Sequence, residues 1–174
     1  MKLALYQGLS PCGDIEQGLK TVDHILSQAG RGGVEMMVFP ELFLPGYNQG
    51  SAHHHHAQKQ GGAWETTLGK TAAKANCALT IGWSERFGDA VYNAASCFDA
   101  SGQKIAHFRK IQLWGPVEKS IFDFGDAYTV FDFKGRKAAL LICYDVEFPQ
   151  HVRALKQRGV ELILVPTANP SGFE

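Results

Sequence analysis

The sequence lacks an excess of charge of either sign, a long apolar run and any abundance of cysteine. Seventeen Lys and Arg side chains balance seventeen Asp and Glu side chains, so we expect no basic surface for nucleic acid or an anionic membrane. No segment approaches the roughly 20 apolar residues of a membrane span. The opening stretch "MKLALYQG" also lacks the apolar core and cleavage site of a signal peptide. These absences exclude nucleic-acid-binding and membrane-spanning proteins from our expectation.

Cysteine is sparse: four residues in 174, without a CxxC pair or a regular spacing. Such usage in a chain of this size predicts free thiols in a reducing cytoplasm. We interpret Cys12, Cys77 and Cys97 as packing or incidental residues. With 45% hydrophobic residues the chain can bury one sizeable core, so we expect a single domain over residues 1–174.

Alternating strand and helix patterns predict an α/β fold. The chain opens with the strand "KLALYQ", an amphipathic helix over 14–29 and the strand "VEMMVFP", which indicates a βαβ unit and a covered parallel sheet. Asp14 is the expected N-cap of this helix and Gly30 its expected stop. Further helices are predicted over 63–76 and 148–158.

The remaining segments read as strands or loops. We expect strands at "ALTIGWSE", "VYNAASCFDA", "QKIAHFRK" and "VELILVPTANP", and a hairpin through Lys134 and Gly135. The segment "IQLWGPVEKSIFDFGDA" has no period, which predicts a structured loop. We expect a polar surface loop around His53 to His56, because four adjacent histidines cannot all face one metal ion.

Three chemically different side chains lie where predicted strands end. Glu41 follows "MMVFP", Lys110 follows "IAHFR" and Cys143 follows "ALLI". Ligands of open α/β sheets bind beyond the carboxyl ends of the strands. We therefore expect these side chains to form one site.

Together these side chains are suited to nucleophilic catalysis. A thiol is a weak nucleophile until it loses its proton, and the Glu41 carboxylate can accept the proton of Cys143. The Lys110 ammonium can stabilise the thiolate, and also the oxyanion that forms when sulfur attacks a carbonyl or nitrile carbon. The backbone N–H of Tyr144 is a second candidate oxyanion donor. The protonated carboxyl can then protonate a leaving amine and later activate water.

Spacing alone leaves other interpretations open. A lone cysteine at the end of an apolar strand is more often a buried core residue. His107 and His151 lie near two of the three residues in the sequence, so a Cys–His thiol hydrolase is a second candidate, although the local cysteine signature is missing. We interpret Asp145 and Glu147 as structural residues near the start of the following helix.

At these positions the sequence resembles the carbon–nitrogen hydrolase (nitrilase) superfamily. "VFPELFLPGY" resembles the segment around the family's catalytic Glu, which is Glu41 here. "FRKIQLWGPVEKSIFDFG" resembles the lysine segment, in which Lys110 matches the catalytic lysine and Glu118 the second family glutamate. "LLICYDVEFPQHVRAL" resembles the nucleophile segment, with Cys143 as the nucleophile, and "GVELILVPTANP" fits the strand after it.

The resemblance implies a four-layer αββα sandwich, a Glu–Lys–Cys triad and a covalent thioester intermediate. It implies no metal and no organic cofactor, a small-molecule amide, nitrile or carbamoyl-amide substrate, and a homo-oligomer in which sandwiches stack. Among the branches we favour amide hydrolysis. Candidates for the pocket lining are Tyr47, Trp114 and Phe122.

This chain is shorter than the members of the family that it resembles. Family domains are longer, and their last strands and helices have no counterpart before Glu174. We expect an unpaired sheet edge beside "ELILVP", which favours self-association. The rival hypothesis is accordingly a non-catalytic binding or scaffold protein that keeps the fold.

Overall fold

The computed structural model describes residues 1–169, which form two sheets and five α-helices. Sheet A has the strand order β1-β2-β3-β4-β5, parallel from β1 to β3 and antiparallel from β3 to β5. Sheet B has the order β6-β7-β8, with β6 antiparallel and β8 parallel to β7. The strands are β1 Leu3–Leu5, β2 Met36–Val38, β3 Ala78–Phe87, β4 Ala90–Phe98, β5 Lys104–Arg109, β6 Val130–Phe133, β7 Arg136–Leu140 and β8 Leu162–Leu164.

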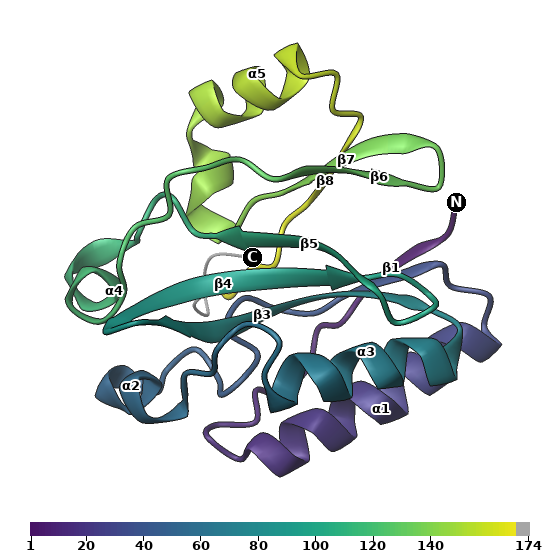
Figure 1. Ribbon diagram of the computed structural model, residues 1–174, viewed down its shortest axis with the longest axis horizontal. Coiled ribbons are helices and arrows are strands. Elements are labelled where there is room, and N and C mark those ends of the chain that lie inside the picture. Colours follow the sequence, from purple (N-terminus) through teal and green to yellow (C-terminus); the bar gives the residue numbers. More distant parts are fainter. Residues whose placement is uncertain (170–174) are drawn as a thin grey trace.

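The elements stack in four layers (Figure 1). Helices α1 (Ile15–Arg31) and α3 (Ala63–Ala75) cover the outer face of sheet A, and α5 (Pro149–Gln157) covers sheet B. One apolar cluster joins α1 and α3 to sheet A, and a second lies between the sheets and reaches Leu155 of α5. The predicted αββα sandwich is confirmed.

The first helix begins where the sequence predicts and ends later. The Asp14 side chain accepts the backbone N–H of Gln17 at 2.9 Å, as an N-cap does. The helix passes through Gly30 and is capped by Gly32, so the predicted stop was wrong. A Cβ at Gly30 would lie 2.0 Å from the carbonyl oxygen of Ala75. Glycine here therefore allows the close approach of α1 and α3.

Two predicted loops contain helices. The first holds α4 (Gly115–Ile121), a short helix without a period, whose Glu118 side chain is tied to Lys110. The second predicted loop holds the 3-10 turn η1 (Gly50–Ala52), followed by the histidine run itself, which forms α2 (His53–His56). His53 is buried, with its ring nitrogens 2.6 Å from the Ser84 hydroxyl and 3.1 Å from the Tyr47 carbonyl. Both helices are accompanied by side-chain hydrogen bonds to groups outside the helix, which helix periodicity does not encode.

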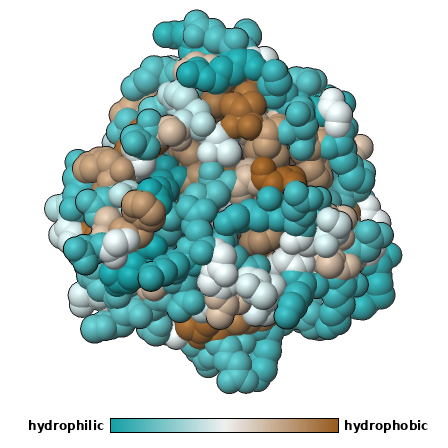
Figure 2. Space-filling view, viewed as in Figure 1, coloured by the Kyte–Doolittle hydropathy of each residue, from teal (hydrophilic) through white to brown (hydrophobic). Residues whose placement is uncertain are grey.

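The outer surface is mainly hydrophilic in the view of Figure 2, with hydrophobic residues gathered below α5 at the level of sheet B. The predicted last strand is regular only at β8, and Pro170 of that segment lies outside the described residues. Within residues 1–169, β8 pairs with β7 alone and forms an edge. Among these residues no helix has the length and apolarity needed to cross a membrane.

Candidate active site

Cys143 lies just past β7, at the first position of a short 3-10 helix, η2 (Cys143–Glu147). Its φ of +44° is in the left-handed region, which is unusual for a residue with a Cβ and is typical of functional sites. Asp145 holds this turn, because its two oxygens accept the backbone N–H groups of Ile142 at 3.0 Å and Gln112 at 2.7 Å. The interpretation of Asp145 as structural is thus supported, whereas Glu147 lines the cavity described below.

Glu41 is placed by a close approach of its loop to β3. A Cβ at Gly82 would lie 2.5 Å from the backbone nitrogen of Leu42 and 2.6 Å from the Cα of Glu41. Only glycine therefore lets the segment after β2 lie directly on β3. The Glu41 carboxylate therefore lies just past the end of β2, between the strand ends of the two sheets, and is 1% exposed.

Lys110 directly follows β5 and lies between two carboxylates. Its Nζ is 2.6 Å from Glu41 Oε1, and 3.0 and 2.9 Å from the two oxygens of Glu118. Glu118 in turn accepts the backbone N–H of Trp114 at 2.8 Å and the Tyr47 hydroxyl at 2.5 Å. Because the lysine is 1% exposed, these carboxylates hold its ammonium in one position.

Two further groups reach Glu41 that sequence reasoning missed. The Asn93 side chain of β4 donates to Oε1 at 2.8 Å, and the backbone N–H of Ala168 donates to Oε2 at 3.2 Å. A sequence signal for Asn93 existed, since an amide in an apolar strand needs a buried polar partner. Ala168 carries no such signal because its contribution is a backbone group.

The electrostatics favour a neutral thiol in the resting site. Burial raises the pKa of Cys143 to about 12, and the negative charge of Glu41 acts in the same direction, while Lys110 and the Ala168 N–H lower it. Lys110 thus acts on Cys143 in the expected direction, because its charge lowers the pKa of the thiol, but burial and the charge of Glu41 outweigh it. Burial also raises the pKa of Glu41, which increases its affinity for a proton. For Lys110, burial lowers the pKa, but Glu41 and Glu118 outweigh burial and raise it, so the ammonium stays charged.

A cavity of about 730 Å³ opens beside Cys143 and Glu41. This is the size of a small-molecule pocket. Its mainly apolar and aromatic wall includes two of the three predicted lining residues, Tyr47 and Trp114, and also Tyr144, which was expected as an oxyanion donor. Phe122, the third predicted lining residue, is buried against His53 and lines an adjacent hollow of about 270 Å³.

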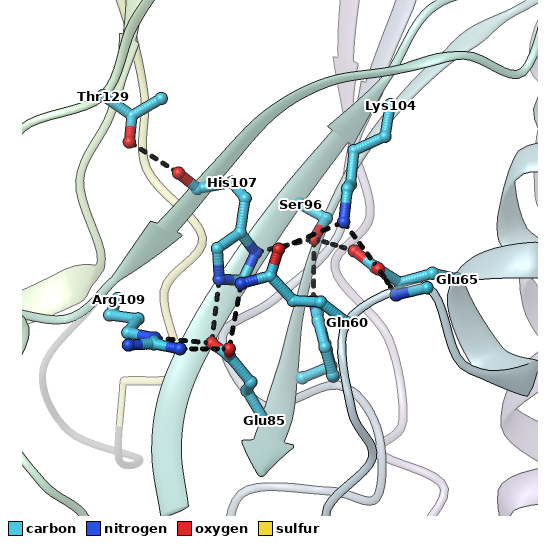
Figure 3. Close-up of polar contacts among 10 residues, drawn as sticks. Gln60, Glu65, Glu85, Ser96, Lys104, His107, Arg109 and Thr129 are labelled. Carbon is cyan, nitrogen blue, oxygen red and sulfur yellow. Dashed lines mark hydrogen bonds and ion pairs between the residues drawn. The ribbon is translucent and has the colours of Figure 1, made fainter. Parts of the chain in front are cut away.

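The two histidines considered for a Cys–His hydrolase have hydrogen-bond partners other than Cys143. His107 contacts the Ser96 hydroxyl at 3.1 Å and Glu85 at 2.8 Å, within a polar network on sheet A (Figure 3). The nitrogens of His151 contact Tyr128 at 2.6 Å and Gln112 at 3.1 Å. Since all four ring nitrogens have these partners, the geometry does not support a Cys–His hydrolase.

Within residues 1–169, no group of three or more His, Cys, Asp or Glu side chains is arranged to hold a metal ion. The described cysteines are free thiols, with Cys77 and Cys97 buried in the two cores and Cys12 exposed.

Comparison with known proteins identifies the family. The family model for carbon-nitrogen hydrolases matches residues 2–173. A hydrolase in the pqqF 5′ region of Pseudomonas protegens is 38% identical over 172 residues, and an (R)-stereoselective amidase of Pseudomonas sp. is 33% identical over 170. The structure of an amidase from Nesterenkonia sp. matches with a TM-score of 0.93 at 33% identity. The chain belongs to the carbon–nitrogen hydrolase family.

The matches cover nearly all of this chain and only part of each relative. The two Pseudomonas proteins align with 97% of this chain but with 60% and 61% of their own lengths. The match to the amidase structure covers 99% of this chain and 66% of the amidase chain. The chain thus spans about three fifths of the length of these curated relatives.

Proposed function

We propose that this chain supplies the catalytic residues of an amidase-type carbon–nitrogen hydrolase that acts on small amides. The observation that carries the proposal is the buried Lys110 ammonium, 2.6 Å from Glu41, beside the cavity that Glu41 shares with Cys143. The names of two relatives, one an (R)-stereoselective amidase and one a Nesterenkonia amidase, favour the amide branch.

The first half-reaction forms a thioester. Glu41 takes the thiol proton as Cys143 Sγ bonds to the amide carbon, and negative charge develops on the amide oxygen. Lys110 and the backbone N–H of Tyr144 stabilise this oxyanion. The tetrahedral intermediate then collapses, the carbon–nitrogen bond breaks, and the proton on Glu41 passes to the leaving nitrogen, which departs as ammonia or an amine.

The second half-reaction regenerates the thiol. Glu41 takes a proton from water as the water oxygen bonds to the thioester carbon. The carbon–sulfur bond breaks, the acid product leaves, and the proton returns to Cys143. Glu118 keeps the Lys110 ammonium in place through both steps, because both of its oxygens accept hydrogen bonds from Nζ. A nitrile would first form a thioimidate with Cys143. Water would then add to the thioimidate and release ammonia, and the resulting thioester would follow the second half-reaction.

Intact-protein mass spectrometry after incubation with a panel of amides and nitriles tests this proposal. We expect an acyl adduct on Cys143 with amides, ammonia in solution, and neither with Cys143→Ala. Cys12→Ala is the matched control, since Cys12 is an exposed thiol outside the site. A thioimidate adduct with nitriles alone would identify the nitrile branch. Absence of any adduct would favour the rival hypothesis of a non-catalytic protein that keeps the fold.

A further inference from the structure

The side chain of Asn93 has an unusual hydrogen-bond balance. It is fully buried on β4, and its Nδ2 donates to Glu41 Oε1 at 2.8 Å. Its Oδ1 has no hydrogen-bond partner, and among residues 1–169 it is the sole buried side-chain polar atom in that state. Leaving a buried carbonyl unpaired is destabilising, so the amide keeps this orientation against a cost to folding.

The orientation is the one that a negative Glu41 requires. With Nδ2 toward the carboxylate, the positive end of the amide dipole faces the charge. The reversed amide would direct Oδ1, an acceptor, at a second acceptor. An apolar residue of similar volume would remove the unpaired carbonyl altogether, which indicates that the donor serves the carboxylate rather than stability.

The two oxygens of Glu41 have different surroundings. Oε1 accepts two short hydrogen bonds, from Lys110 at 2.6 Å and from Asn93 at 2.8 Å. Oε2 accepts one longer bond, from the Ala168 backbone at 3.2 Å. The oxygen with fewer and weaker donors has the larger remaining capacity to accept a proton.

We propose that Asn93 is a positioning residue that saturates Oε1 of Glu41 and so makes Oε2 the oxygen that exchanges protons with Cys143, with substrate nitrogen and with water. This inference rests on the proposed function for the role of Glu41. The Asn93 side chain is not part of the cavity wall, and its one hydrogen bond is to Glu41. Its backbone carbonyl also accepts the backbone N–H of Lys110 at 2.8 Å, a contact that a side-chain substitution keeps.

Loss of the Asn93 donor changes the pH dependence expected of Glu41. The Asn93 N–H stabilises the ionised form of Glu41, so its loss raises the pKa of Glu41 further. A base with a higher pKa stays protonated to higher pH, and the acid limb of the acylation profile moves upward. The titratable side chains that face Glu41 come from the end of β5, from α4 and from η2: Lys110, Glu118 and Cys143.

The test compares Asn93→Ala with Ser96→Ala. Both positions are buried on β4, and Ser96 belongs to the separate network of Glu65 and His107. We expect Asn93→Ala to lower the single-turnover acylation rate of Cys143 by about 10- to 100-fold at neutral pH, with an acid limb at higher pH. Ser96→Ala lowers thermal stability and leaves the position of that limb unchanged.

A second readout is independent of turnover. The carboxylate of Glu41 is titrated by infrared difference spectroscopy against a Glu41→Gln reference, in the wild type, in Asn93→Ala and in the isosteric Asn93→Asp. We expect a higher pKa of Glu41 in both variants, with the larger rise in Asn93→Asp because a second carboxyl faces the first. An unchanged Glu41 titration overturns the inference. A wild type that titrates as expected but never acylates refutes the proposed function instead.

Discussion

At the scale of single residues, the candidate site brings a carboxylate, an ammonium group and a thiol together. Glu41 and Cys143 share the cavity wall, and Lys110 lies between Glu41 and Glu118. Burial and the charge of Glu41 raise the pKa of the Cys143 thiol to about 12, which favours a neutral thiol at pH 7. Under the proposed function, transfer of the thiol proton to Glu41 therefore generates the nucleophile.

The raised pKa predicts slow alkylation of Cys143 by iodoacetamide at neutral pH. The exposed Cys12 should react first, and the rate at Cys143 should rise as the pH approaches about 12. Lys110→Ala should slow Cys143 further, because it removes the cation that lowers this pKa. Peptide mapping by mass spectrometry after timed labelling measures both rates. Faster labelling of Cys143 than of Cys12 at pH 7 would contradict a neutral resting thiol.

At the scale of elements, the outer face of sheet A is covered by helices in one part and by ion pairs in another. The apolar cluster under α1 and α3 includes residues of β1 to β4. Farther along β3 and β5, Glu85 accepts hydrogen bonds from Arg109 at 2.9 Å and from the His107 ring at 2.8 Å, and Gln60 donates at 3.0 Å (Figure 3). A buried carboxylate with this many donors ties the strands together while it remains ionised.

This network predicts a specific loss of stability in acid. Burial raises the pKa of Glu85, but hydrogen bonds from Arg109, His107 and Gln60 outweigh burial and lower it from 4.5 to about 2. A lowered folded-state pKa contributes stability above pH 4.5, and that contribution disappears as the pH falls from 4.5 to 2. Glu85→Gln should thus destabilise the fold by roughly 2–3 kcal/mol at pH 7 and by little at pH 2.

Urea unfolding of both forms across this pH range measures the difference. The control is Glu161→Gln, which removes an ion pair with Arg136 in which both partners are about half exposed and which should change stability by less than about 1 kcal/mol. An equal effect of Glu85→Gln at pH 7 and pH 2 would show that packing, not ionisation, is responsible.

At the scale of the whole molecule, the five strands of sheet A face only three strands of sheet B within residues 1–169. The side chains of β1 show the consequence. Ala4 packs under the helices, whereas Leu3 and Leu5, on the opposite face of the strand, are 38% and 69% exposed. The free edge of β8 is a second such feature within residues 1–169, and exposed edges and apolar faces favour association between chains.

We therefore expect a 174-residue polypeptide to self-associate in a concentration-dependent way. Leu5→Lys should reduce this association, because it places a charge on the uncovered face at a position where folding buries little of the side chain. Leu9→Lys, at a 90% exposed position outside the strands, is the matched control and should leave it unchanged. Size-exclusion chromatography with light scattering provides the masses. A monomer at all concentrations would contradict the expectation.

Local pattern in the sequence was sufficient to predict most elements and to nominate the candidate reacting groups. Helix periodicity, the Asp14 cap and the hairpin at Lys134 and Gly135 were predicted, because each depends on interactions within a few residues. The family motifs indicated a sandwich, and the position of three reactive side chains at strand ends indicated one site.

Only the tertiary structure decided how that site is tuned. Asn93 reaches Glu41 across 52 positions of the chain and the Ala168 backbone reaches it across 127. The helix α4, the burial of His53 and the elevated pKa of Cys143 also depend on groups distant in sequence. A sequence specifies which groups are available, but hydrogen-bond partners and burial are set when separate strands pack together, and these determine the pKa of each titratable group in the site.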